Sequence, residues 1–240
     1  MKSFITILFS LLILTSCNKS TEITNTQDYS GYLATTNDHS NHSSIQINFW
    51  SKRIKSDSLQ LIGLSKVAQA YEEKFQSSGD ISQLKKAESA LTKASEIAAI
   101  DKDNYLRALA KNYITQHRFR EAKQALETAA KIGGNIKSNL FMQFDVALEL
   151  GEFEDAKKYL EQTVDFSNFD YLTRRAKWED HIGNLDKTIH YMERALSLAE
   201  NSNKDALKIW THTNLADYYG HAGRLEDSYN EYLNALAIDP

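Results

Sequence analysis

The stretch DNYLRALAKNYITQHRFREAKQALETAAKIGGN, residues 103–135, decides the fold. Its first half carries an apolar face at helical spacing, formed by Leu106, Leu109, Ala110 and Tyr113. Its second half carries another such face, formed by Phe119, Ala122, Leu126 and Ala129. The pattern predicts two amphipathic helices in antiparallel contact. Such a hairpin cannot bury its apolar face alone, so we expect copies of it on either side.

The copies are present along the chain. Their second helices share a small, bulky, small spacing: Ala87, Leu91 and Ala94; Phe153, Ala156, Leu160 and Thr163; Leu185, Thr188, Met192 and Ala195; Leu225, Ser228, Tyr232 and Ala235. Gly151, Gly183 and Gly223 precede three of these helices, where a tight turn favours a residue without a side chain. Five units in register indicate a repeat array.

The repeat unit resembles the tetratricopeptide repeat (TPR), a helix-turn-helix of about 34 residues. Leu109–Ala110 stands at the family's Leu-Gly pair, and Tyr113 stands at its tyrosine. The last unit matches best, through Leu215–Ala216 and Tyr219. The resemblance implies an all-α fold, an α-solenoid of antiparallel helix pairs wound into a TPR superhelix over residues 45–240. The repeats expected are 58–100, 103–136, 137–168, 169–204 and 207–240, with residues 45–56 packed beneath the first as a half-repeat.

Three residues, at two places in the array, depart from the family pattern. In the helix expected over residues 169–182, Arg175 and Glu179 stand where the pattern has Leu and Tyr. His117 replaces the glycine of the turn in the 103–136 unit. Packing around the first pair is therefore the least regular part of the expected array.

The N-terminus reads MKSFITILFSLLILTSC, with Lys2 before an apolar run and small residues before Cys17. It resembles a bacterial lipoprotein signal peptide, which implies removal of residues 1–16 and lipidation of Cys17. The alternatives are a plain secretory signal or an N-terminal membrane anchor, although the apolar run is shorter than the roughly 20 residues that span a bilayer. Asn18 follows the cysteine, which favours a lipid-anchored protein of the cell envelope, at the periplasmic face of the outer membrane.

Residues 17–44 are rich in Ser, Thr and Asn and show no helical period. This composition predicts a flexible polar tether behind the lipidated cysteine. As a coil it would extend on the order of 30 Å, enough to lift the folded part off the membrane surface.

The residues offer little for catalysis, metal binding or nucleic-acid binding. The net charge is -4 without a basic run, so nucleic acid is not an expected partner. No metalloprotease, phosphate-loop or nucleophile-elbow motif occurs, and the single cysteine is assigned to the lipid. His39 and His42 lie close together without a third ligand. We therefore expect no enzyme, no cofactor and no metal site.

The resemblance also implies a site, because TPR proteins bind peptides or partner helices along the concave surface of their first helices. The residues expected in that groove are Asn104, Arg107, Lys111, Phe141, Asp145, Thr173, Lys177, Trp210 and Asp217. Arg107 and Lys111 could pair with carboxylates of a partner, and Phe141 and Trp210 could anchor apolar side chains. The alternative is an ordinary solvated face, with Trp210 packed on the preceding loop. The family's carboxylate clamp is not reproduced.

The last helix leaves Tyr229, Tyr232 and Leu236 without a following helix to cover them. This face predicts a partner contact, a dimer contact, or further repeats beyond the chain. Together these features predict a membrane-anchored, non-catalytic scaffold or assembly factor for protein partners. A glycan- or small-ligand-binding lipoprotein of an outer-membrane uptake system and a piece of a longer repeat-containing signalling protein remain as alternatives.

Overall fold

A computed structural model describes residues 22–33, 40–54 and 60–239. Within these ranges the chain forms helices and no strands, so the predicted all-α class is confirmed. The helices are α2 (Thr26–Leu33), α3 (Ser40–Ser51), α4 (Leu61–Ser78), α5 (Ile81–Ile97), α6 (Lys102–Thr115), α7 (Phe119–Ile132), α8 (Ile136–Glu149), α9 (Phe153–Glu161), α10 (Phe169–His181), α11 (Leu185–Glu200), α12 (Asp205–His221) and α13 (Leu225–Ile238). Cys17 and the predicted signal peptide lie outside the described residues.

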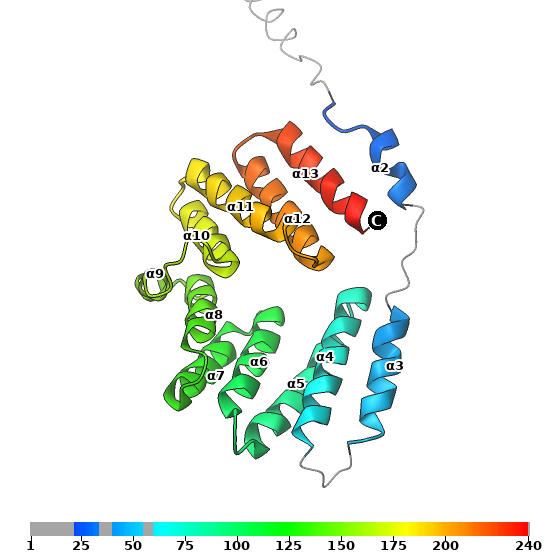
Figure 1. Cartoon of the computed structure of the whole chain (residues 1–240), viewed down its shortest axis with the longest axis vertical. Helices are drawn as coiled ribbons and strands as arrows, with labels where there is room; N and C mark the ends of the chain where they lie inside the picture. Colours follow the sequence, from blue (N-terminus) through cyan, green and yellow to red (C-terminus); the bar gives the residue numbers. More distant parts are fainter. Residues whose placement is uncertain (1–21, 34–39, 55–59, 240) are drawn as a thin grey trace, which may run out of the picture.

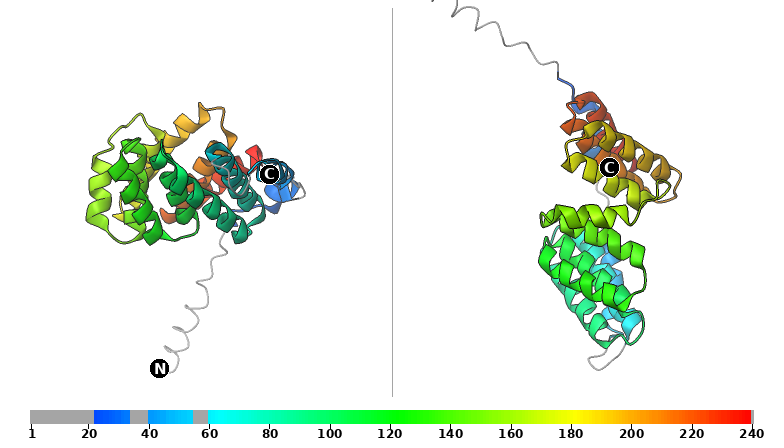
Figure 2. Two further views of the ribbon diagram at one scale, coloured as in Figure 1. Left: turned by 90° about the horizontal axis from the view of Figure 1, so that it is seen from below. Right: turned by 90° about the vertical axis from the view of Figure 1, so that its left-hand side faces the viewer.

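The helices from α4 to α13 form five antiparallel pairs, each packed against the next. The pairs follow a curved path, and their first helices lie along its inner side (Figure 1). Seen from its left-hand side, the molecule is a stack along its long axis (Figure 2). The predicted α-solenoid is therefore confirmed.

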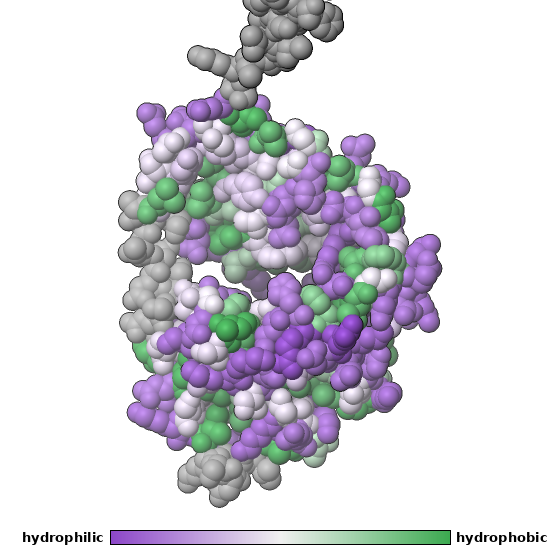
Figure 3. Space-filling view, turned by 180° about the vertical axis from the view of Figure 1, so that it is seen from behind, coloured by the Kyte–Doolittle hydropathy of each residue, from purple (hydrophilic) through white to green (hydrophobic). Residues whose placement is uncertain are grey.

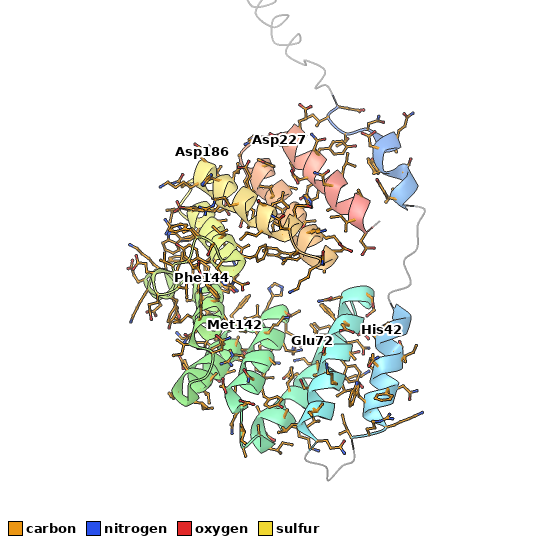
Figure 4. All side chains as sticks on the ribbon, viewed as in Figure 1. His42, Glu72, Met142, Phe144, Asp186 and Asp227 are labelled. Carbon is orange, nitrogen blue, oxygen red and sulfur yellow. The ribbon has the colours of Figure 1, made fainter. Side chains whose placement is uncertain are left out.

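The apolar core is distributed along the stack in clusters, each shared by neighbouring repeats. Leu126 is fully buried between α6 and α7 together with Val146, which comes from α8. Phe144 of α8 packs in the next cluster with Tyr171 of α10 (Phe144 is labelled in Figure 4). Because each cluster needs residues from two units, one hairpin cannot bury its own face, as the sequence pattern predicts.

The turns between the two helices of a pair share one backbone conformation, in which a residue with positive φ follows the first helix. Gly151, Gly183 and Gly223 have φ values of 75°, 78° and 73°, the left-handed region that costs glycine little. The next N–H closes the turn by donating to a carbonyl of the first helix, as in Asn184 N to Glu179 O at 2.8 Å. The predicted role of the glycines is confirmed, and His117 takes the same conformation with a φ of 56°.

The predicted tether of residues 17–44 is wrong for the part that the structure describes, because α2 and the start of α3 lie within it. α3 packs along α4, as the half-repeat prediction requires, but it begins at Ser40. α2 packs against α13 at the other end of the stack (Figure 1). The sequence of α2 is polar and has no apolar period, so it gave no sign of a helix. The helix it packs against, α13, lies about two hundred residues away in the chain.

Tyr229 makes the polar contact between α2 and α13. Its hydroxyl donates to the Asn25 carbonyl at 3.1 Å and lies 3.2 Å from the Asp28 carboxylate. The same oxygen accepts the Asn25 N–H at 3.1 Å. The outer face of α13 is therefore partly covered by this chain, which corrects the expectation that no helix covers it.

Ion pairs join neighbouring repeats at a sequence separation close to one repeat. They are Arg118–Glu88 at 2.8 Å, Lys123–Glu152 at 2.6 Å, Lys137–Asp165 at 2.8 Å, Arg174–Asp145 at 2.6 Å and Lys177–Glu149 at 2.8 Å. Each pair links residues 28 to 30 positions apart. These pairs help to fix the register of one hairpin on the next.

Candidate interaction groove

A groove of about 460 Å³ lies between α8, α10 and α12, three consecutive first helices. Its lining residues are Asp145, Phe169, Asp170, Thr173, Arg174, Lys177, Asp180, Trp210, Asn214 and Tyr218. We call it the α10 groove. Four of the predicted site residues, Asp145, Thr173, Lys177 and Trp210, are brought together there. From behind, the molecule is hollowed at its centre, with hydrophilic residues along the lower edge of the hollow and paler, partly hydrophobic residues above it (Figure 3).

Helical periodicity explains which side chains of α10 line the groove. Asp170, Thr173, Lys177 and Asp180 are spaced by three or four residues and share one face. The Asn168 side chain accepts the Tyr171 N–H at 2.9 Å and caps the start of this helix. The cap therefore sets where the face begins.

Two contacts connect α10 to α12 at opposite ends of the groove. At one end the rings of Phe169 and Trp210 meet edge to face, with 6.0 Å between centroids. At the other end His221 Nδ1 lies 3.2 Å from the Asp180 carboxylate. Trp210 remains 45% exposed, so its indole is accessible from the groove.

The cations of the groove are already paired with carboxylates. The Arg174 guanidinium donates to Asp145 at 2.6 Å and to the Phe141 carbonyl at 3.0 Å. The Lys177 ammonium donates to Glu149 at 2.8 Å. Burial raises the pKa of the Asp145 carboxyl, although Arg174 and Lys177 act in the opposite direction. The pairs therefore neutralise the basic side chains of the groove within the protein.

Tyr218 forms part of the wall on α12. Burial raises the pKa of its phenol above the usual value, and the carboxylates of Asp180 and Asp217 raise it further. The phenol is therefore neutral at physiological pH and offers a hydrogen-bond donor beside the aspartates.

Two predicted groove residues are buried, which corrects the expectation that they face a partner. The side chain of Arg107 is 7% exposed and donates to Asp103 at 2.6 Å within α6. Gly134 makes room for this pair, because a Cβ there would lie 1.8 Å from the Asp103 carboxylate. Phe141 is 5% exposed and packs in the core, beneath the Arg174 guanidinium.

The remaining predicted residues lie outside the α10 groove. Asn104 and Lys111 are exposed on α6, a helix that contributes no residue to the lining of the α10 groove. Asp217 is exposed on α12 next to Tyr218, and it accepts a hydrogen bond from the Tyr232 hydroxyl. The nine residues therefore do not form one continuous site.

Sequence analysis missed Phe169, Asp170, Arg174, Asn214 and Tyr218 among the lining residues. Spacing carried a signal for some of them. Arg174 follows Asp145 by 29 residues, close to one repeat, and this separation places the two side chains on adjacent first helices. Trp210, Asn214 and Tyr218 recur every fourth residue of α12, on one face.

Two further features are absent from the part of the chain that the structure describes. No group of three His, Cys, Asp or Glu side chains lies close enough to hold a metal ion. Among the same residues, no helix combines the length and apolar character needed to cross a bilayer.

No protein-family model and no curated protein sequence matches the chain. Solved structures do resemble it. A thermophilic TPR protein from Thermus thermophilus superposes with a TM-score of 0.59 at 18% identity, over 75% of this chain and 92% of that one. The Cut9–Hcn1 hetero-tetramer structure of APC/C matches with a TM-score of 0.62 at 14% identity, over 98% of this chain and 42% of that one. BtubC from P. vanneervenii matches with a TM-score of 0.51 at 19% identity, over 83% and 89% of the two chains. At these identities the likeness establishes a TPR-type fold.

Proposed function

We propose that this chain is a non-catalytic scaffold whose α10 groove binds an extended segment of a partner protein. The observation that carries the proposal is an exposed Trp210 in a groove built by three consecutive first helices. Tryptophan is among the residues that most often dominate the binding energy of protein interfaces. The TPR-type fold supports the proposal, because solenoids present extended concave surfaces of this kind.

The chemistry of the groove favours binding over catalysis. Its lining contains no serine or cysteine, and the Thr173 hydroxyl donates to a carbonyl of its own helix at 3.2 Å. Arg174 and Lys177 are committed to carboxylates. An activated nucleophile needs a neighbouring base and a free reacting group, and these side chains do not provide that arrangement.

The proposed scaffold is anchored to the bacterial cell envelope through a lipid on Cys17, at the periplasmic face of the outer membrane. The support is the resemblance of the N-terminus to a lipoprotein signal peptide. Labelling of cells with an alkyne fatty acid tests this part. We expect label on the wild-type chain and none on Cys17→Ser, and a labelled Cys17→Ser chain would contradict the anchor.

A comparative pull-down tests the groove itself. The full chain, Trp210→Ala and Phe49→Ala are used as baits in extracts of the source cells. Phe49 is a matched control, because it is 44% exposed and lies on α3, away from the groove. We expect a protein partner that is retained by wild type and Phe49→Ala and lost by Trp210→Ala. Equal retention by all three baits, or retention of oligosaccharide alone, would contradict the proposed function.

A further inference from the structure

We propose that the α10 groove selects a cationic segment: an extended peptide with two Lys or Arg side chains about four residues apart. This inference rests on the proposed function and specifies the chemistry of the partner. It depends on the charges of the groove, on the exposure of individual carboxylates, and on the position of Trp210.

Carboxylates outnumber cations in and around the groove. Asp145, Asp170 and Asp180 line it. Glu149 borders it on α8, where it binds the lining residue Lys177. Arg174 and Lys177 are the two Arg or Lys side chains in the lining, and both already bind carboxylates. The groove therefore carries an excess of negative charge, which a cationic partner would neutralise.

Two of the carboxylates are accessible to a ligand. The Asp170 side chain is 62% exposed and makes only a long contact of 3.7 Å with Arg174. The Asp180 side chain is 28% exposed, and the contact it makes is with His221 Nδ1 at 3.2 Å. Asp170 and Asp180 thus present negative charge that no Lys or Arg of the groove holds closely.

An anionic segment would be rejected by the same arrangement. To reach Arg174 or Lys177 it would have to displace Asp145 or Glu149. The displaced carboxylate and Asp170 would then face the ligand with like charge, and like charges in contact oppose binding. The groove therefore discriminates by repulsion as well as by attraction.

The geometry of α10 sets the spacing of the basic side chains. Asp170 and Asp180 are ten residues apart on one face, which corresponds to about 15 Å along an α-helix. An extended peptide covers this distance in roughly four or five residues. Trp210 lies at the Asp170 end, beside Phe169, and its exposed face can receive the first cation or its aliphatic stem.

Labelled synthetic peptides test the inference by fluorescence anisotropy with the full chain. Three ten-residue peptides share one Gly/Ser/Leu frame and carry Lys, Gln or Glu at two positions four residues apart. We expect the Lys peptide to bind, and added salt to weaken it because exposed charges are screened. Asp170→Asn and Asp180→Asn should each weaken binding by roughly two- to fivefold. Asp186→Asn, an exposed site at the start of α11 (Figure 4), should leave it unchanged.

A charge exchange keeps the test independent of general damage to the groove. We expect Asp170→Lys/Asp180→Lys to lose the Lys peptide and to bind the Glu peptide. Equal binding of the Gln and Lys peptides, or a Glu peptide preferred by wild type, would overturn the inference while leaving the proposed function intact. No binding by any peptide would also overturn it, and the pull-down with Trp210→Ala would still decide the proposed function separately.

Discussion

The carboxylate of Glu179, which is 1% exposed, binds the guanidinium of Arg175 one turn earlier on α10. These are the two positions at which the family pattern has Leu and Tyr. Arg175 Nε and the second carboxylate oxygen of Glu179 are buried without a hydrogen-bond partner. A polar pair therefore replaces an apolar contact between helices, and its hydrogen bonds are incomplete. Its contribution to stability depends on both members being present.

Replacing one member of the Arg175–Glu179 pair should lower the free energy of unfolding more than replacing both. We expect Arg175→Leu to lower the free energy of unfolding by about 3 kcal/mol, because it leaves a buried carboxylate unpaired. Arg175→Leu/Glu179→Tyr should be close to wild type or more stable. Urea unfolding of wild type, Arg175→Leu, Glu179→Tyr and the double variant measures these values.

The exposed pair Arg224–Asp227 provides the control cycle, because both side chains are about half exposed. Its coupling should be below about 1 kcal/mol. If the Arg175 and Glu179 substitutions simply added, the buried pair would not be a coupled unit.

His117 is held in a backbone conformation that glycine adopts in three equivalent turns. Its φ is 56°, and a side chain in this region costs roughly 1 kcal/mol or more. We expect His117→Gly to raise the free energy of unfolding by about 1 kcal/mol. Gly183→Ala, at a φ of 78° and with nothing within 4 Å of the added Cβ, should lower it by a similar amount. Destabilisation by His117→Gly would mean that the His117 ring matters more than the turn.

Asp165 should make stability depend on acid pH. The Lys137 ammonium, then the Ser167 hydroxyl and N–H, hold the pKa of Asp165 at about 2, below its usual 3.8. A carboxyl with a lowered pKa stabilises the folded state above its unfolded value, and this contribution is lost as the pH falls from 3.8 through about 2. Asp165→Asn should therefore flatten the decline of the melting temperature in that window. An NMR titration of the Asp165 carboxyl carbon with a midpoint near 4 would contradict this.

The Tyr229 hydroxyl should hold α2 on α13. Tyr229→Phe removes its hydrogen bonds to Asn25 and Asp28, which should speed amide hydrogen exchange in residues 26–33 about fivefold. Tyr232→Phe on the same helix is the control, because that hydroxyl donates to Asp217. Unchanged exchange in Tyr229→Phe, or equal acceleration by both variants, would show that this contact does not hold α2.

The repeat array was predictable because helical periodicity is a local signal. Leu126 and its equivalents recur at fixed spacing, and each leucine occupies the interior that the spacing indicates. α2 was not predictable in this way, since it has no buried residue and Tyr229, which contacts it, lies about two hundred residues away in the chain. The helix is stabilised by a contact that exists only in the folded chain, so no local sequence pattern predicts it.

The groove was only partly predictable, because the position of a residue in the repeat does not determine whether its side chain is exposed. Trp210 and Lys177 line it as expected. Arg107 occupies the repeat position that Thr173 has in the groove, yet it lies in the interior, paired with Asp103 in the space left by Gly134. Arg174 enters the groove because Asp145 lies opposite it on α8. Such pairings between helices require knowledge of both partners.

Site-specific photocrosslinking in the source cells tests the central claim most directly. A benzophenone amino acid is placed at Asn214 in the groove or at Asp186 on α11, outside it. We expect irradiation to yield a discrete protein adduct from position 214 and none from position 186. The same adduct from both positions, or none from position 214 under conditions in which the chain is folded, would contradict a partner bound in the α10 groove.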